Sequence, residues 1–375
     1  MDISFKFDPE VLIGSDTLSM AGTIASRHGS RIMIAADHSL DSQSVNRLKE
    51  ILEDSGLEAI IFDGIEETSS VEMADNIVEL SRAAHCDAII GFGGQKTQII
   101  ARMTAIMAPM RLTAFELLDG RIYHTKFFPF IAIPTEGMDA FSTTNFFIAA
   151  DPRTRLIKSI PSPDDLYSAI IIDNSLIKFQ SNTTAMTFIL EGFFSAVEAF
   201  CSTKASFISD ALLERAITFY AKLLRAGANE INMELFSQAS FLTAIGSSSS
   251  SPGFGAALSA AINARSTALK PLCSAALFPV IAERLVSARP EKMSRIASFL
   301  GAPRPASVAE GAASSVEAVR RLMTSLNVPS GLQEYNIQLD KITAAAEAVR
   351  SLDLTANSPW TVSEEEVFKI LKQVL

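Results

Sequence analysis

The sequence is poor in the residue types that mark several common classes of protein. It has three cysteines in 375 residues, Cys86, Cys201 and Cys273, and their wide spacing fits neither a disulfide framework nor a zinc motif. We therefore expect a cytoplasmic protein whose cysteines are small buried side chains. No apolar run approaches the roughly 18 residues of a membrane span, and residues 1–10 lack the apolar core of a signal peptide. We expect no membrane partner.

Basic residues are also scarce. The chain has 32 Lys and Arg against 42 Asp and Glu, which gives a net charge of −10 and a pI near 5.1. Because nucleic-acid binding depends on clustered Lys and Arg, we exclude nucleic acid as a partner. The mean hydropathy of +0.25 is high for a chain without a membrane span. It indicates a large helical core or a subunit interface, so a homo-oligomer is one expectation.

Short apolar segments rich in β-branched residues recur through the first half of the chain. Helical periodicity at 44–55 and 71–84 separates the early ones. This alternation predicts a parallel sheet with right-handed crossovers, a Rossmann-like domain over residues 1–178 that binds ligands at the carboxyl ends of its strands. The predicted strands are 31–36 (RIMIAA), 58–62 (EAIIF), 87–91 (DAIIG), 128–134 (FPFIAIP) and 168–173 (SAIIID).

Strand signals end near residue 179, and helical periodicity takes over. We predict an all-helical domain over residues 179–375, with a cleft for a small-molecule ligand between it and the sheet. The stretch 246–255 (GSSSSSPGFG) is expected to be a flexible or tightly turned loop between two helices. The predicted helices are 187–200, 209–226, 238–245, 256–263, 274–287, 290–300, 315–326 and 364–375.

Nine short motifs follow one another along nearly the whole chain. They are VLIGSDTLSMAG at 11–22, IAADHSL at 34–40, FDGIEETSSVE at 62–72, CDAIIGFGG at 86–94, IAIPT at 131–135, IIIDNSLI at 170–177, VEAF at 197–200, ALFP at 276–279 and EEEVFKILK at 364–372. In this order and spacing they resemble the iron-containing alcohol dehydrogenase family, which is related to dehydroquinate synthase. The resemblance implies an oxidoreductase that interconverts small alcohols and carbonyl compounds with NAD(P).

The resemblance also implies a dinucleotide at a glycine turn that opens a helix, whose N–H groups and dipole face the pyrophosphate. Here the family's third glycine is replaced by Gln95 and its serine by Lys96. Lys96 is unfavourable at a helix N-terminus unless an anion lies beside it, and the alternative is a solvated surface lysine. The residues expected to contact the cofactor are Asp37, Gly91, Gly93, Gly94, Gln95, Lys96, Thr135 and Thr143.

Acidic residues modify the expected cofactor site. Glu136 and Asp139 stand where the family pattern continues toward Gly-Thr-Gly-Ser-Glu, and they are expected to place negative charge beside the pyrophosphate. Asp37 matches the acid that binds the adenosine ribose hydroxyls. If a dinucleotide binds, the match favours NAD over NADP.

The family's metal ligands, one Asp and three His, are not reproduced. The histidines are His28, His38, His85 and His124, all in the first domain. Anchoring the motif on Glu198 and Ala199 places Glu191 and Ser195 at the Asp and first His positions, whereas a register shifted by one places Leu190 and Phe194 there. The later histidine positions fall at Ala256, Ala260 and Lys270. We therefore expect no tightly bound transition metal.

Three hypotheses remain for Glu191, Ser195 and Lys270, the candidate catalytic residues. The Lys270 ammonium, paired with Glu191, replaces the metal as an electrophile. Alternatively, the cleft binds an anionic ligand without redox chemistry, or these residues are ordinary polar groups at a domain boundary. For the whole chain, the choice lies between a metal-independent or altered-metal oxidoreductase and an inactive family member that serves as a binding or assembly module.

Overall fold

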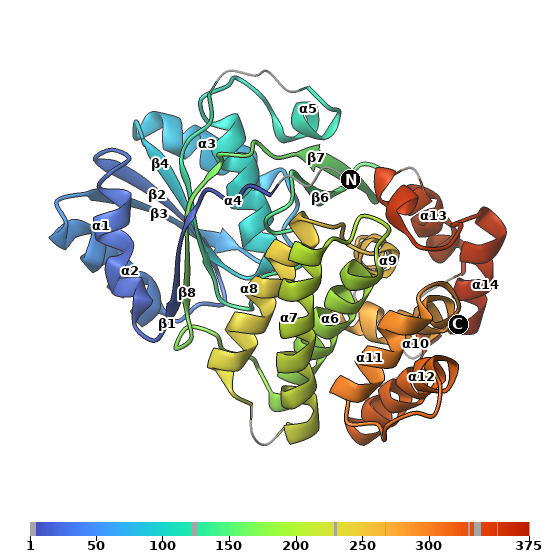
Figure 1. The fold of residues 1–375 in the computed structure, drawn as a ribbon. Helices are drawn as coiled ribbons and strands as arrows, with labels where there is room; N and C mark the ends of the chain where they lie inside the picture. Colours follow the sequence, from blue (N-terminus) through green and yellow to red (C-terminus); the bar gives the residue numbers. More distant parts are fainter. Residues whose placement is uncertain are drawn as a thin grey trace.

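The computed structural model describes residues 5–121, 126–228, 231–266, 268–328, 331–333, 339–350 and 352–374 (Figure 1). One half of the molecule is a six-stranded parallel sheet with the order β1-β8-β5-β4-β2-β3, so the predicted Rossmann-like sheet is confirmed. Its strands are β1 (Glu10–Gly14), β2 (Arg31–Asp37), β3 (Glu58–Ile65), β4 (Ala88–Gly93), β5 (Phe130–Pro134) and β8 (Tyr167–Asp173).

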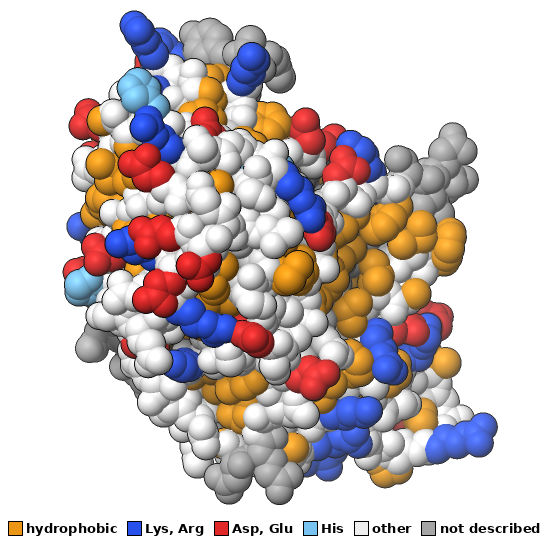
Figure 2. Space-filling model, turned by 90° about the vertical axis from the view of Figure 1, so that its left-hand side faces the viewer, with side chains coloured by type: hydrophobic (Ala, Val, Ile, Leu, Met, Phe, Trp, Pro, Cys, Tyr) orange, Lys and Arg blue, Asp and Glu red, His pale blue; other side chains and the backbone are white. Residues whose placement is uncertain are grey.

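Both faces of the sheet are covered, as the apolar strands require. Ile32 and Ile34 of β2 pack in a cluster with α2, whereas Met33, between them, packs in the larger cluster with α3 and α4. Acidic and basic side chains are interspersed on the outer face of this half (Figure 2). The helices of this half are η1 (Thr17–Met20), α1 (Ala21–Ala25), α2 (Ser42–Asp54), α3 (Met73–Ala83), α4 (Gln95–Met107) and α5 (Ala114–Leu118).

The remaining described residues after β8 contain helices and no strand, which confirms the predicted helical half. The predicted boundary at 178/179 lies between β8 and α6. Helices α6 and α10 are long and apolar enough to cross a membrane, but 83% and 67% of their apolar windows are buried inside the molecule, as in core helices. The elements are α6 (Asn182–Cys201), α7 (Phe207–Ala226), α8 (Met233–Ser248), α9 (Phe254–Asn263), α10 (Lys270–Ala288), α11 (Pro290–Phe299), α12 (Val308–Ser325), α13 (Leu339–Arg350), η3 (Asp353–Asn357) and α14 (Glu364–Val374).

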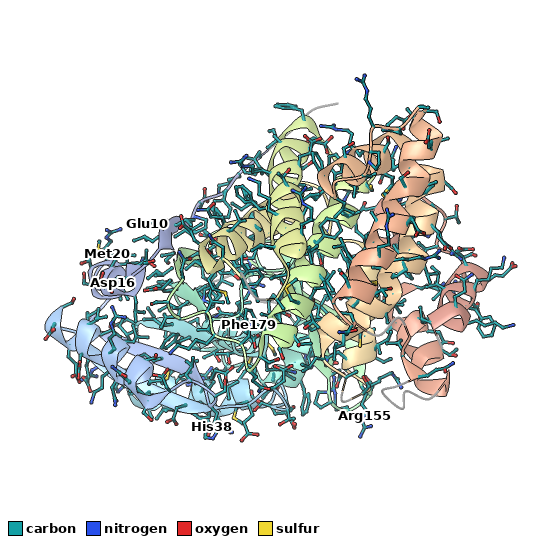
Figure 3. All side chains as sticks on the ribbon, turned by 90° about the horizontal axis from the view of Figure 1, so that it is seen from below. Glu10, Asp16, Met20, His38, Arg155 and Phe179 are labelled. Carbon is teal, nitrogen blue, oxygen red and sulfur yellow. The ribbon has the colours of Figure 1, made fainter. Side chains whose placement is uncertain are left out.

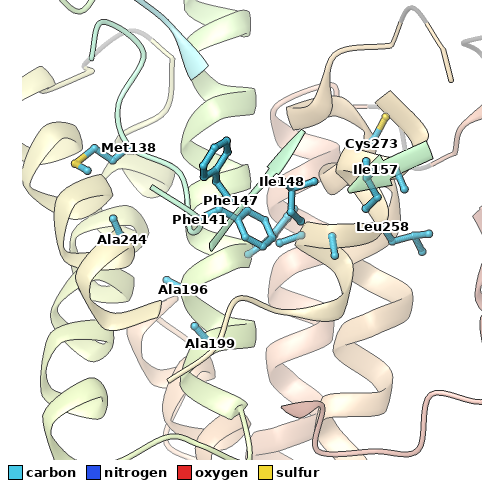
Figure 4. Packing of buried hydrophobic residues seen from close by; sticks show 14 of the residues in the cluster. Met138, Phe141, Phe147, Ile148, Ile157, Ala196, Ala199, Ala244, Leu258 and Cys273 are labelled. Carbon is cyan, nitrogen blue, oxygen red and sulfur yellow. The ribbon is translucent and has the colours of Figure 1, made fainter. Parts of the chain in front are cut away.

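An antiparallel hairpin that we did not predict joins the two halves. Its strands are β6 (Phe146–Asp151) and β7 (Leu156–Pro161). Figure 4 shows Phe147 of β6 and Phe141, from the loop before it, in the apolar junction, with Ala196 of α6 and Leu258 of α9 in the same cluster. The junction is therefore a packed apolar contact.

The serine-rich stretch differs from the expected loop at its start, because α8 continues to Ser248. Gly246 is required there by close packing, since a Cβ would lie 2.5 Å from Leu213 Cγ. The hydroxyls of Ser248 and Ser250 donate to the carbonyls of Ile245 and Gly246. Both carbonyls lie in the last turn of α8, where a helix leaves its carbonyls without partners, so the serine hydroxyls satisfy the end of the helix.

Candidate functional site

The side chain of Lys270 joins the two halves of the molecule at the start of α10. Its Nζ lies 2.8 Å from Glu191 Oε1 on α6 and 3.0 Å from Asp139 Oδ2 in the loop after β5. A longer contact of 3.5 Å leads to Gln95 Oε1 at the start of α4. The side chains of Lys270, Glu191 and Asp139 are 13%, 5% and 16% exposed. The ammonium is thus held in the junction between the halves and does not extend into solvent.

The charges of this cluster are mutually stabilised. Burial lowers the pKa of Lys270, but Asp139 and Glu191 outweigh it, so the pKa lies well above its ordinary value. Burial likewise opposes ionisation of Asp139, yet Lys270 and the Ser142 hydroxyl bring the pKa of Asp139 below its usual range. Ser142 Oγ and the Phe141 N–H donate to Asp139 Oδ1 at 3.0 and 2.9 Å. One ammonium therefore faces two carboxylates.

The orientation of α6 distinguishes the two sequence registers. Glu191 faces Lys270, whereas Leu190 is buried in the core and Phe194 stacks on Phe278 with ring centroids 3.7 Å apart. Ser195 lies one turn after Glu191 and is buried. Its hydroxyl makes no hydrogen bond with Lys270 or Glu191 among the described residues. The structure thus brings together two of the three candidate catalytic residues.

Glu198, one turn further along α6, holds the start of α9. Its Oε1 and Oε2 accept the N–H groups of Gly255 and Ala256 at 2.7 and 3.1 Å. Burial raises the pKa of Glu198 to about 7, although these two hydrogen bonds favour the ionised form. Ala256 stands where the sequence comparison places one of the family's histidine ligands. Its backbone is held by the Glu198 carboxylate from α6.

The glycine turn at the carboxyl end of β4 keeps the close backbone approach expected of a phosphate-binding loop. Gly93 has φ +154°, and a Cβ on it would lie 2.5 Å from Asp37 Cβ. Gln98 donates from Nε2 to the Gly91 and Gly93 carbonyls at 2.8 and 3.1 Å. The Thr135 N–H also donates to the Gly93 carbonyl, at 3.1 Å. These contacts position Gly94 as the N-cap of α4.

Two carboxylates of the chain lie at this turn. Glu136 Oε2 accepts the Gln95 N–H at 3.1 Å. Asp37 Oδ2 accepts the Thr97 hydroxyl at 3.1 Å and, more weakly, the Gly94 N–H at 3.4 Å. Burial raises the pKa of Glu136 to about 7; the Gln95 N–H opposes this, while nearby acids including Asp37 add to it. The Gln95 N–H, in the first turn of α4, is therefore already bound by a carboxylate of the chain itself.

The predicted cofactor-binding residues separate into two groups. All but one lie along the carboxyl ends of β2, β4 and β5: Asp37, Gly91, Gly93, Gly94, Gln95, Lys96 and Thr135. Thr143 instead lines a pocket of about 590 Å³ formed by residues 5–9 and 247–252 among others. The contacts missed from the sequence are Glu136 with Gln95 and Asp139 with Lys270.

The chemistry of the donor set does not fit a tightly bound transition metal. Glu191 and Asp139 are both paired with Lys270. Among the described residues, no group of three or more His, Cys, Asp or Glu side chains could hold a metal ion. Histidine is the commonest metal ligand in proteins, and His38, one of the four histidines, follows β2 on the sheet half (Figure 3). A lysine between two carboxylates leaves too few ligands for iron or zinc.

The chain matches two adjacent family models. Residues 8–174 match the model described as iron-containing alcohol dehydrogenase, and residues 184–375 match the C-terminal part of the Fe-containing alcohol dehydrogenase family. Among curated proteins, it is 26% identical to sulfoacetaldehyde reductase of Bilophila wadsworthia, covering 94% of this chain and 93% of the relative. It is 23% identical to 1,3-propanediol dehydrogenase of Citrobacter freundii, with coverage of 92% and 91%.

Solved structures share the fold over the full length. A 1,3-propanediol oxidoreductase superposes with a TM-score of 0.92 at 22% identity, covering 100% of both chains. The sulfoacetaldehyde reductase of Bifidobacterium kashiwanohense, solved in complex with NAD+, gives a TM-score of 0.83 at 16% identity, covering 100% of this chain and 99% of that one. At these identities the structural likeness extends to the fold alone.

Proposed function

Because the chain belongs to the iron-containing alcohol dehydrogenase family, we propose that it is an NAD-linked oxidoreductase in which Lys270 takes the place of the metal ion. The family supports oxidoreductase chemistry. The single observation that carries the proposal is the position of Lys270 Nζ, held by Glu191 and Asp139 in the junction between the two halves.

Lys270 can assist the reduction of a carbonyl group. An ammonium has three N–H donors. Lys270 donates to Asp139 at 3.0 Å and weakly to Gln95 at 3.5 Å, and its third close partner is Glu191, in an ion pair at 2.8 Å. A substrate oxygen can replace Gln95 as an acceptor. When hydride reaches the carbonyl carbon, negative charge develops on that oxygen, and a fixed ammonium stabilises it. The raised pKa of Lys270 keeps it charged, so it stabilises the alkoxide electrostatically, and the proton that completes the alcohol comes from solvent.

The nicotinamide supplies the hydride when the cofactor is bound. Gly93 and Gly94 allow a close backbone approach, and Asp37 at the end of β2 suits ribose hydroxyls and disfavours a 2′-phosphate. NAD is therefore the preferred cofactor. The substrate class is a short carbonyl compound or alcohol, by similarity to relatives named for propanediol and sulfoacetaldehyde. A cytoplasmic location and self-association remain predictions.

A second function is favoured by the carboxylates at the turn. Glu136 occupies the Gln95 N–H, and two acids neutralise Lys270. Both observations suit a family member that retains the fold as a ligand-binding or assembly module without turnover.

Fluorescence titration with NADH, followed by assays with short aldehydes with and without an anionic group, separates the two functions. We expect submillimolar NADH binding and aldehyde reduction by the native chain. Lys270→Met should lower kcat by about a hundredfold, whereas Lys270→Arg should retain part of it. Lys178→Met, which removes an exposed lysine paired with Asp41, is the matched control. Absence of NADH binding at millimolar cofactor would favour the module, and an unchanged kcat in Lys270→Met would contradict the role of Lys270.

A further inference from the structure

We propose that Glu136 is an internal competitor for the nucleotide turn, so that a dinucleotide binds this chain only when the Glu136 carboxylate is displaced. The proposal rests on the proposed function, because it concerns the same cofactor site. It assigns Glu136 a role in deciding whether and when the pyrophosphate enters.

The position of Glu136 carries the inference. Its Oε2 accepts the Gln95 N–H at 3.1 Å, one of the N–H groups that an α-helix leaves free at its N-terminus. The same carboxylate lies against the turn, since a Cβ on Gly94 would be 2.3 Å from Oε2. A phosphate that approaches the first turn of α4 would meet a carboxylate at the same hydrogen-bond donor. The two anions cannot both hold the Gln95 N–H.

The surroundings determine how firmly this competitor is held. The acids that act on Glu136 come from separate elements: Asp37 ends β2, Glu67 lies between β3 and α3, and Glu191 lies on α6. Lys96 on α4 and Lys270 on α10 act on the same region through Glu67. Because three acids repel the Glu136 carboxylate, its neutral form is favoured by both repulsion and burial. The ionised Glu136 carboxylate is therefore held less firmly at the Gln95 N–H than it would be without these acids.

Ionisation of Glu136 adds to the competition. The ionised carboxylate repels a pyrophosphate and binds the Gln95 N–H strongly, whereas the neutral acid does neither to the same degree. With the pKa of Glu136 raised to about 7, the neutral form grows as the pH falls through 7. Cofactor affinity of the native chain should therefore rise from pH 8 to pH 6.

Isothermal titration with two probes, inorganic pyrophosphate and NADH, tests the inference. At pH 8, Glu136→Gln should bind both at least about tenfold more tightly than the native chain, since a like charge beside the phosphate is removed. Glu136→Ala, which also frees the Gln95 N–H, should gain as much or more. The matched control is Glu66→Gln, which removes an exposed carboxylate in the loop after β3 whose side chain accepts the Thr68 hydroxyl of the same loop. At pH 6 the gap between native chain and Glu136→Gln should narrow.

The outcomes distinguish the inference from the proposed function. If neither Glu136 variant binds pyrophosphate more tightly than Glu66→Gln does, Glu136 is no competitor. If NADH binds the native chain and Glu136→Gln equally, the inference fails and the NAD-linked function stands. If the Glu136 variants bind pyrophosphate more tightly than the native chain does, but none of the proteins binds NADH, Glu136 does compete for the Gln95 N–H and the NAD-linked function fails.

Discussion

The ammonium of Lys270 lies 2.8 Å from the carboxylate of Glu191, and this pair joins the start of α10 to the middle of α6. Asp139 approaches the same ammonium at 3.0 Å from the loop that follows β5. Two ion pairs to one buried ammonium therefore link the two halves of the molecule. Whether this cluster serves structure, chemistry or both can be separated by experiment.

The first prediction concerns stability. Lys270→Met should lower the free energy of unfolding by about 3–5 kcal/mol, because it leaves two buried carboxylates without their cation. The double variant Lys270→Met with Glu191→Gln should recover part of that loss. Lys178→Met is the control, since its partner Asp41 is 48% exposed and such pairs contribute about 1 kcal/mol or less. Urea denaturation measures all four proteins, and equal losses in the two lysine variants would contradict a structural role for the buried cluster.

The second prediction concerns metal. Purified protein should contain far less than one iron or zinc per chain, and treatment with EDTA should leave the thermal midpoint and any NADH-linked activity unchanged. The reason is the donor set, in which Lys270 holds both Glu191 and Asp139. Elemental analysis and calorimetry before and after chelation provide the measurements. One firmly bound transition ion per chain, lost with stability on chelation, would overturn the assignment of Lys270.

The sequence predicts the sheet well because β2, β4, β5 and β8 are almost wholly buried, and buried parallel strands appear as continuous apolar runs. The hairpin of β6 and β7 escapes prediction because neither FFIAAD nor LIKSIP alternates cleanly between apolar and polar residues. Glu191 and Lys270 could be proposed as neighbours only because both fall on motif positions of one site. The sequence predicts Glu136 and Asp139 beside the nucleotide turn but does not predict their partners, because a loop conformation decides that Asp139 turns to Lys270 and Glu136 to Gln95.

The third prediction tests how α6 presents Glu191. A Cβ on Gly192 would lie 2.2 Å from the buried Tyr220 hydroxyl on α7, so Gly192→Ala must shift α6 or Tyr220. We expect a loss of about 1–3 kcal/mol of unfolding free energy, as is typical of overpacking. Lys270-dependent activity should fall with it, since Glu191 is the adjacent residue. Gly64→Ala is the control, because its Cβ would meet only Phe62, at an ordinary 3.5 Å. Similar stabilities of the two variants would show that this contact is not tight.

The last prediction uses Glu198, the buried carboxylate that accepts the N–H groups of Gly255 and Ala256. Its pKa in the folded chain is about 7, above the ordinary 4.5, so between these values the folded chain binds more protons than the unfolded chain. Stability must therefore fall as the pH rises from about 5 to about 7, by about 1–3 kcal/mol from this group, and then level off. Glu136, with a pKa also near 7, acts in the same direction.

Glu198→Gln should flatten this part of the profile, because the amide carries no proton to release. The carboxylate accepts the Gly255 and Ala256 N–H groups with two oxygens, whereas the amide has only one oxygen to offer them. The variant should therefore also be less stable than the native chain at pH 8. Glu365→Gln, at an exposed position paired with Lys369, is the control and should keep the native profile. Urea midpoints at pH 5, 6, 7 and 8 give the comparison. A native slope retained in Glu198→Gln would mean that this carboxyl group titrates near its ordinary value, and that its two hydrogen bonds to α9 outweigh its burial.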